Sequence, residues 1–81
     1  MPLVVYTKRG CPWCDGVRQL LTDKHVAYEE REVRDNPEFF AELVAKSQQE
    51  LTPTLDLNGE ILADTDAEAV AIWLKEKGLD K

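Results

Sequence analysis

The sequence has few histidines and cysteines, no excess of positive charge and no long hydrophobic run. Its 81 residues include one histidine and two cysteines, whereas a structural zinc site normally takes four ligands. Ten lysines and arginines face sixteen aspartates and glutamates, and the net charge of −6 argues against nucleic acid and anionic membranes as partners. The apolar run near the start, residues 3–6, is too short for the core of a signal peptide, and the sequence has no run of transmembrane length. We therefore expect a cytoplasmic protein that binds neither nucleic acid nor membrane.

Glycine and proline are also scarce, with four residues each, which excludes a low-complexity chain. Hydrophobic residues make up 43% of the sequence, which is too apolar for intrinsic disorder. A chain of this length buries about 60–65% of its unfolded surface, enough for one small core. We expect a single domain over residues 1–81 and a monomer.

The two cysteines lie in Cys11-Pro12-Trp13-Cys14, between an apolar run and a helical pattern. Residues 3–7 are predicted to form a buried strand, and residues 12–24 an amphipathic helix. Cys11 would then sit at the helix N-terminus, where free N–H groups and the positive dipole end favour a thiolate. Cys14 follows one turn later on the same side, close enough to attack a mixed disulfide on Cys11. The spacing predicts a dithiol for disulfide exchange.

Two other interpretations of the cysteines are a structural disulfide and half of a zinc site. Cytosolic reductants would keep a passive disulfide open. The one histidine, His25, lies at a predicted helix end, far along the chain from Cys14. Both alternatives are weaker than a redox role. Asp15 would oppose thiolate formation, because a neighbouring carboxylate disfavours a second negative charge.

The remaining elements follow from periodicity and turn signals. They are an edge strand over 26–33, a helix over 37–46, strands over 54–57 and 60–63, and a last helix opening at 64–66. Asn36 is the expected cap of the second helix, and Asn58-Gly59 is typical of a type I′ hairpin. Thr65 with Glu68 fits a capping box for the last helix, with Asp64 as the rival cap. The residues expected to be buried on the last two helices are Phe39, Phe40, Leu43, Val44, Ala67, Val70, Ala71, Ile72, Trp73 and Leu74.

The order βαβαββα, with Cys-Pro-Trp-Cys after the first strand and a proline before the third, resembles the glutaredoxins, small members of the thioredoxin-fold superfamily. The resemblance covers nearly the whole chain. Its residues are Tyr6-Thr7-Lys8, Cys11-Pro12-Trp13-Cys14, Leu51-Thr52-Pro53 and Asp64-Thr65-Asp66. It implies an α/β, thioredoxin-like fold with a four-stranded mixed sheet flanked by three helices.

The resemblance also implies roles around the dithiol. Cys11 corresponds to the nucleophile and Cys14 to the resolving thiol. Lys8 corresponds to the cation beside the thiolate and the glycyl carboxylate of glutathione, although on its own it reads as a surface charge. Trp13 stands where the family has its aromatic residue and either contacts substrate or packs.

Glutathione binding is implied for two further segments. The backbone of Thr52, before a cis Pro53, would pair with the cysteinyl unit of glutathione. Thr65 and Asp66 would hold the γ-glutamyl end, although these residues have a purely structural alternative as helix caps. Two departures from the family pattern place side chains where relatives leave room for the tripeptide: Leu51-Thr52 replaces Thr-Val, and Leu62-Ala63 replaces paired glycines.

These residues favour a glutathione-dependent thiol–disulfide oxidoreductase that reduces protein disulfides or protein–glutathione mixed disulfides, and so serves electron transport and cell redox homeostasis. The alternative is a thioredoxin-like hydrogen donor, for example to ribonucleotide reductase, recharged by a reductase. A module that bridges an iron–sulfur cluster is disfavoured, because Pro12 stiffens the turn and Cys14 offers the thiolate another use. We expect glutathione as co-substrate and no metal.

Overall fold

The computed structural model describes residues 3–79 and has the predicted order of elements. They are β1 (Leu3–Thr7), α1 (Pro12–Asp23), β2 (Glu29–Glu32), α2 (Pro37–Ser47), β3 (Thr54–Leu57), β4 (Glu60–Leu62) and α3 (Ala67–Glu76). The strands form one sheet in the order β2-β1-β3-β4. β1 and β2 are parallel, whereas the β1–β3 and β3–β4 pairs are antiparallel. The predicted four-stranded mixed sheet with three helices is confirmed.

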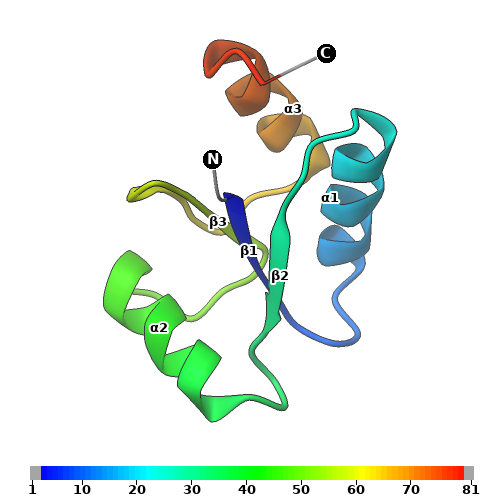
Figure 1. Cartoon of the computed structure of the whole chain (residues 1–81). Coiled ribbons are helices and arrows are strands. Elements are labelled where there is room, and N and C mark those ends of the chain that lie inside the picture. The colour runs from blue at the N-terminus through cyan, green and yellow to red at the C-terminus, as the bar shows by residue number, and fades with distance from the viewer. Residues whose placement is uncertain (1–2, 80–81) are drawn as a thin grey trace.

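Helices cover both faces of the sheet, α1 and α3 on one and α2 on the other (Figure 1). Because side chains alternate along a strand, β1 supplies both cores: Leu3 and Val5 face α1 and α3, and Val4 and Tyr6 face α2. The larger core joins Leu3, Val5, Val17, Leu21, Leu55, Leu57, Val70 and Leu74, and the smaller one joins Val4, Tyr6, Val33 and Leu43. A continuous apolar run in β1 is therefore what a strand covered on both faces requires.

The edge strand β2 is shorter than predicted, because the chain first completes the C-terminal turn of α1. The Val26 N–H donates to the Leu21 carbonyl at 2.9 Å, and His25 adopts a left-handed backbone with φ 56°. His25 is exposed. Val26 packs against the larger core from outside the strand. The apolar alternation that suggested a strand from residue 26 therefore reflects packing of a turn.

The predicted capping box of α3 is wrong, and its cap is the alternative candidate Asp66, whereas the predicted cap of α2 is confirmed in position. Asp66 caps α3, since its Oδ1 accepts the Ala69 N–H at 2.9 Å, so neither Thr65 nor Asp64 is the cap. Asn36 occupies the cap position of α2, but its side-chain amide donates to the Glu32 carbonyl instead of serving the helix. At the start of α3 three polar residues follow one another in the chain, and the last of them is the cap.

Ile72 is also placed differently from the prediction. Its side chain is 58% exposed, although helical spacing put it among the buried residues of α3. Val70 and Leu74 are fully buried, and Trp73 packs partly buried against the larger core. The buried stripe of α3 is therefore narrower than its apolar composition suggested.

Gly16 provides a test of how α1 packs against α3. A Cβ at this position would lie 3.6 Å from Ala67 Cβ, an ordinary van der Waals contact. Glycine in a helix interior costs roughly 0.5–1 kcal/mol relative to alanine. We expect Gly16→Ala to raise the free energy of unfolding by about 0.5–1 kcal/mol in urea titrations.

A matched alanine substitution at Gly59 should have the opposite sign. Gly59 has φ 95° in the β3–β4 turn, and alanine is strained in that region even though nothing crowds its Cβ. A Gly16→Ala variant less stable than the wild type would show that α1 and α3 lie closer together than described.

Candidate active site

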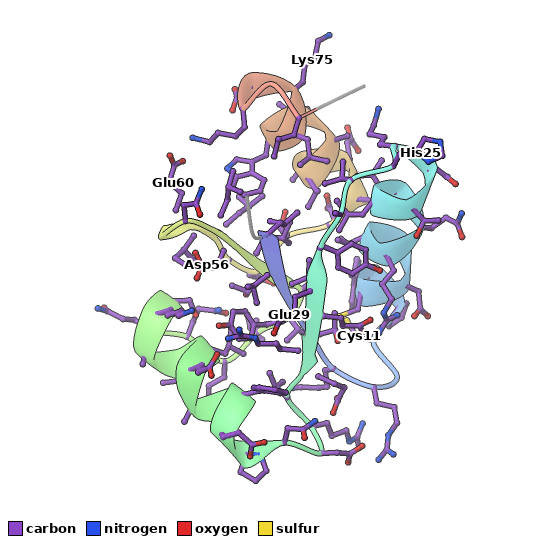
Figure 2. All side chains as sticks on the ribbon, viewed as in Figure 1. Cys11, His25, Glu29, Asp56, Glu60 and Lys75 are labelled. Atoms are coloured by element: carbon purple, nitrogen blue, oxygen red, sulfur yellow. The ribbon has the colours of Figure 1, made fainter. Side chains whose placement is uncertain are left out.

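Cys11 is the N-cap residue of α1, with Pro12 in the first turn. Its sulfur accepts the Cys14 N–H at 3.3 Å, and its own N–H donates to the Lys8 carbonyl at 3.1 Å. Figure 2 shows Cys11 at the end of α1 that adjoins the loop from β1. The predicted position of Cys11 at a helix N-terminus is confirmed.

The two free thiols differ in acidity. Burial raises the pKa of the fully buried Cys14 thiol to about 11, and its hydrogen bond to Cys11 acts in the same direction. Burial also opposes ionisation of Cys11, but hydrogen bonds from the Cys14 thiol, the Cys14 N–H and the Thr52 hydroxyl outweigh it and lower the pKa of Cys11. Cys11 therefore ionises first, as a nucleophile needs.

The segment before β3 lies against the dithiol. The Thr52–Pro53 peptide bond is cis, as the family resemblance implied, and Pro53 is buried. The carbonyl and hydroxyl oxygens of Thr52 each lie 3.8 Å from Cys11 Sγ. Thr52 and Cys11, 41 positions apart in the chain, thus meet at one site.

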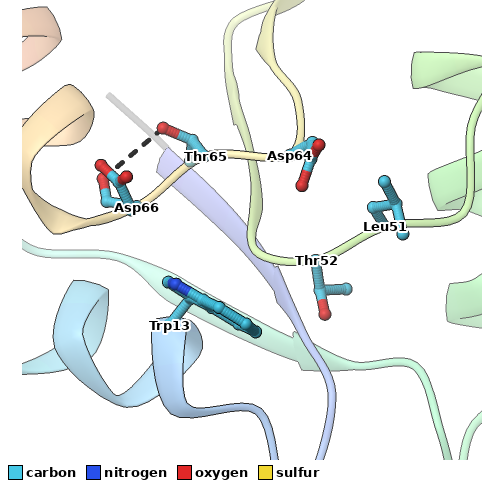
Figure 3. Close-up of a pocket in the computed structure, with 6 residues that line it drawn as sticks. All are labelled: Trp13, Leu51, Thr52, Asp64, Thr65 and Asp66. Atoms are coloured by element: carbon cyan, nitrogen blue, oxygen red, sulfur yellow. Dashed lines mark hydrogen bonds between the residues drawn. The ribbon is translucent and has the colours of Figure 1, made fainter.

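A pocket of about 230 Å³ opens beside this contact (Figure 3). It is lined by Trp13, Leu51, Thr52, Asp64, Thr65 and Asp66. The Trp13 side chain is 63% exposed, so it presents a ring to solvent and is not core packing. The pocket joins the three segments that the resemblance assigned to glutathione.

Thr65 and Asp66 have different structural roles in the wall of the pocket. Thr65 is buried, and its N–H donates to the Pro53 carbonyl at 3.0 Å. Asp66 uses one carboxylate oxygen to cap α3. The expectation that Leu62 would fill the space for a tripeptide is wrong, because Leu62 packs against the larger core and does not line the pocket. Leu51, which is 53% exposed, does line it.

Lys8 reaches the dithiol through its backbone. Its carbonyl accepts the Cys11 N–H, and its side chain is partly buried. Among residues 3–79 the Lys8 ammonium group forms no ion pair and no hydrogen bond. A contact of this cation with the thiolate or a bound carboxylate stays a prediction.

Sequence reasoning missed Glu32, which fixes the loop ahead of Cys11. Its carboxylate accepts the N–H groups of Arg9, Arg34 and Asp35 at 2.8–2.9 Å. Burial opposes its ionisation, but these backbone hydrogen bonds hold the pKa of Glu32 below its ordinary value. A single glutamate at a strand end carries no sequence signal for this role.

A second unpredicted contact concerns Asp15, whose carboxylate forms an ion pair with Arg18. The Arg18 Nε also donates to Glu30 Oε2 at 2.7 Å, and the same oxygen accepts the Thr7 hydroxyl. Because Arg18 compensates the charge of Asp15, the expected opposition of Asp15 to the Cys11 thiolate is reduced.

In the described part of the chain, no group of three or more histidine, cysteine, aspartate and glutamate side chains is arranged to hold a metal ion. Across the same residues, every helix is too short or too polar to cross a bilayer.

Comparison with known proteins identifies the family. The family model for glutaredoxin matches residues 3–62. The chain belongs to the glutaredoxin family. A glutaredoxin from Pseudomonas aeruginosa is 37% identical to it over 54 residues, which cover 67% of this chain and 64% of that protein. The match thus spans less than two thirds of the length of this relative.

Solved structures confirm the thioredoxin-like fold of this glutaredoxin. The thioredoxin-like protein BC3987 is 31% identical, with a TM-score of 0.77 over 95% of this chain and 97% of that one. The NrdH-redoxin from Escherichia coli shares the fold at 18% identity, with a TM-score of 0.70 over 83% of this chain and 84% of that one. A buckwheat glutaredoxin in complex with glutathione shares it at 21% identity, with a TM-score of 0.70 over 96% of this chain and 71% of that one.

Proposed function

We propose that this glutaredoxin reduces protein disulfides, or mixed disulfides between proteins and glutathione, by thiol–disulfide exchange at Cys11 and Cys14. The observation that carries the proposal is the placement of a half-buried Cys11 at the N-terminus of α1, where its sulfur accepts the N–H of the fully buried Cys14. The proposed setting is the cytoplasm, where glutathione keeps thiols reduced, and the proposed active form is a monomer.

The first step is attack of the Cys11 thiolate on one sulfur of the substrate disulfide. A bond forms between Cys11 Sγ and that sulfur, the old S–S bond breaks, and the other sulfur leaves as a thiolate that takes up a proton. In the second step, Cys14 loses its proton and attacks Cys11 Sγ. The reduced substrate thiol is released, and the enzyme is left with a Cys11–Cys14 disulfide.

The structure supports this order of steps through Cys14. The hydrogen bond to Cys11 and the charge of Cys11 both raise the pKa of Cys14. Once Cys11 is joined to substrate, its negative charge is gone and these two contributions disappear. Cys14 is therefore a weak competitor for substrate in the reduced enzyme and becomes more acidic when it is needed to resolve the intermediate.

We propose glutathione as the reductant that restores the dithiol, two molecules being oxidised for each disulfide reduced. In this proposal the glutathione sulfur approaches Cys11 beside Thr52, while Thr65 and Asp66 hold the γ-glutamyl end. The buckwheat glutaredoxin bound to glutathione, which shares this fold, is consistent with such a site.

The alternative, a hydrogen donor recharged by a reductase, is favoured by the lining of the pocket. Asp64 and Asp66 contribute two carboxylates, and none of the described residues that line it is a lysine or an arginine. Glutathione carries two carboxylates and one ammonium group, so its net negative charge does not favour binding to this lining. The NrdH-redoxin, which has a thioredoxin-like activity profile and shares this fold, is consistent with such a role.

Reduction of a glutathionylated protein separates the two proposals. With glutathione as the only reductant, we expect both the wild type and Cys14→Ser to turn over within about tenfold of each other, because a second glutathione can resolve the intermediate on Cys11. The rate of glutathione disulfide formation is the measurement.

A protein disulfide without glutathione is the internal control. Here Cys14 is needed to resolve the mixed disulfide on Cys11. The reduction of the protein disulfide by Cys14→Ser should therefore be at least about tenfold slower than its reduction by the wild type. A wild type that is inactive with glutathione but active with thioredoxin reductase would establish the alternative. A wild type inactive with both reductants would refute an oxidoreductase function.

A further inference from the structure

The pocket lies beside the sulfur to which a protein substrate would be joined. Thr52 contacts Cys11 Sγ and also lines the pocket. An extended chain advances about 3.3–3.6 Å per residue, so a side chain within two residues of the substrate cysteine reaches this space. The residues that line the pocket can therefore contact the side chains next to the reactive cysteine of a protein substrate.

The apolar part of the lining suits a long side chain. The exposed ring of Trp13 and the exposed side chain of Leu51 lie on two sides of the space (Figure 3). Alkyl stems of lysine and arginine cover apolar surface of this kind. The face of a tryptophan also attracts a cationic head group, most often a guanidinium.

The polar part of the lining supplies a charge of the opposite sign. Asp64 is exposed, and among residues 3–79 its carboxylate has no hydrogen-bond or ion-pair partner. Its backbone is left-handed, with φ 49°, and its N–H donates to Thr54 Oγ1 at 3.4 Å, which fixes where the side chain begins. Figure 3 shows the Asp64 side chain pointing into the space that the lining encloses. Asp66 adds a second carboxylate, although one of its oxygens caps α3.

We infer that this pocket selects protein substrates that carry a basic residue, preferably arginine, within two positions of the reactive cysteine. The inference rests on the proposed function and names its substrate class. Arginine can contact all three parts of the lining at once. Its alkyl stem covers apolar surface, and its planar guanidinium stacks on the Trp13 ring and pairs with the Asp64 carboxylate. Glutathione, which is anionic overall, can offer Asp64 the ammonium group of its γ-glutamyl end, but it has no long alkyl stem and no guanidinium for Leu51 and Trp13.

An exchange equilibrium tests the inference without turnover. The Cys14→Ser variant is prepared with glutathione joined to Cys11, and a short cysteine peptide with a neighbouring arginine is added. The peptide thiolate attacks Cys11 Sγ and glutathione leaves as its thiolate, so no external oxidant or reductant is needed. The matched peptide carries citrulline, which has nearly the same shape as arginine but no charge. The same exchange with free glutathione disulfide corrects for the different acidity of the two peptide thiols.

We expect the arginine peptide to displace glutathione about three- to tenfold more effectively than the citrulline peptide at low salt, and the difference to shrink as salt is raised. Asp64→Asn should reduce this preference about two- to fivefold. Asparagine also tolerates left-handed backbone, so the turn is preserved. Glu76→Gln on α3 removes the same charge away from the pocket and should leave the preference unchanged.

Equal displacement by the two peptides would overturn the inference while leaving the proposed function intact. So would an arginine preference that persists in Asp64→Asn or is lost equally in Glu76→Gln. If no thiol exchanges at Cys11 at all, the proposed function fails, and the inference fails with it.

Discussion

Iodoacetamide is expected to alkylate Cys11 about 10²–10³ times faster than Cys14 in the reduced protein at pH 7. The pKa of about 11 leaves roughly one Cys14 in ten thousand ionised at this pH, whereas the pKa of Cys11 is lowered. The more basic Cys14 thiolate is the stronger nucleophile, which recovers about a factor of ten. The Cys14 side chain is also fully buried, so iodoacetamide reaches it only after local opening of the structure. This slow access offsets the higher nucleophilicity of the Cys14 thiolate, and Cys11 still reacts much faster.

The measurement is peptide mass spectrometry after brief labelling, repeated over a range of pH. The alkylation rate of Cys11 should rise with pH and level off at a pKa below that of a free cysteine. The Cys14→Ala variant is the sharpest comparison, because it removes the thiol that donates to Cys11 but keeps the Cys14 N–H. We expect its inflection to move to higher pH, and that of Cys14→Ser, which keeps a donor, to move less. Equal labelling of both cysteines, or an inflection at the pKa of a free thiol, would contradict the site as described.

The dithiol was predictable because its signals are local. Two cysteines at this spacing, a proline after the first, and a strand-to-helix junction fix the N-terminal position of Cys11 without long-range information. The acidity difference was only partly predictable. The helix terminus was foreseen, but the hydrogen bonds from Thr52 and the complete burial of Cys14 depend on how distant segments fold together.

The pocket shows the limit of pattern reasoning more clearly. The resemblance assigned the γ-glutamyl end to Thr65 and Asp66, yet among residues 3–79 the carboxylate without a partner belongs to Asp64, a member of the same motif that is also a candidate helix cap. Leu62 and Leu51 looked equally able to fill the site, but one is turned into the core and the other lines the pocket. The direction of Leu62 is set by the register of β4, where a one-residue shift would reverse it, whereas Leu51 lies ahead of β3, outside the sheet.

The fold was predictable where two independent signals coincided. The hairpin had both alternating strands and Asn58-Gly59, and both turn residues do have positive φ, at 53° and 95°. The start of β2 and the buried stripe of α3 rested on apolar residues alone, and the predictions failed there, at Val26 and Ile72. An apolar side chain indicates burial only as a tendency, since much of any protein surface is apolar.

Truncation of Leu55 to alanine is expected to lower the free energy of unfolding more than an alanine substitution at Gly59 or Leu51. Leu55 is fully buried in β3, opposite Val5 of β1 and Leu62 of β4 in the strand register. Leu55→Ala removes buried methyl groups and leaves a cavity, for which comparable substitutions cost about 2–5 kcal/mol. For a domain of this size, a loss of about 3 kcal/mol lowers the melting temperature by roughly 12–24 °C. Urea titration and thermal unfolding followed by circular dichroism measure both quantities.

Leu51→Ala makes the same chemical change at a side chain that is 53% exposed, and it should cost less than about 0.5 kcal/mol. Leu55→Ala should change the stability of the protein without changing the acidity of Cys11. In the folded molecules of Leu55→Ala, the pH inflection of Cys11 alkylation should match the wild type, because the groups that lower the pKa of Cys11 lie in Cys14, Thr52 and Trp13. A Leu55→Ala variant that kept wild-type stability would mean that β3 does not pack beneath α1 and α3. One that stayed stable but shifted the inflection would mean that β3 tunes the thiol directly as well as holding up the sheet beneath it.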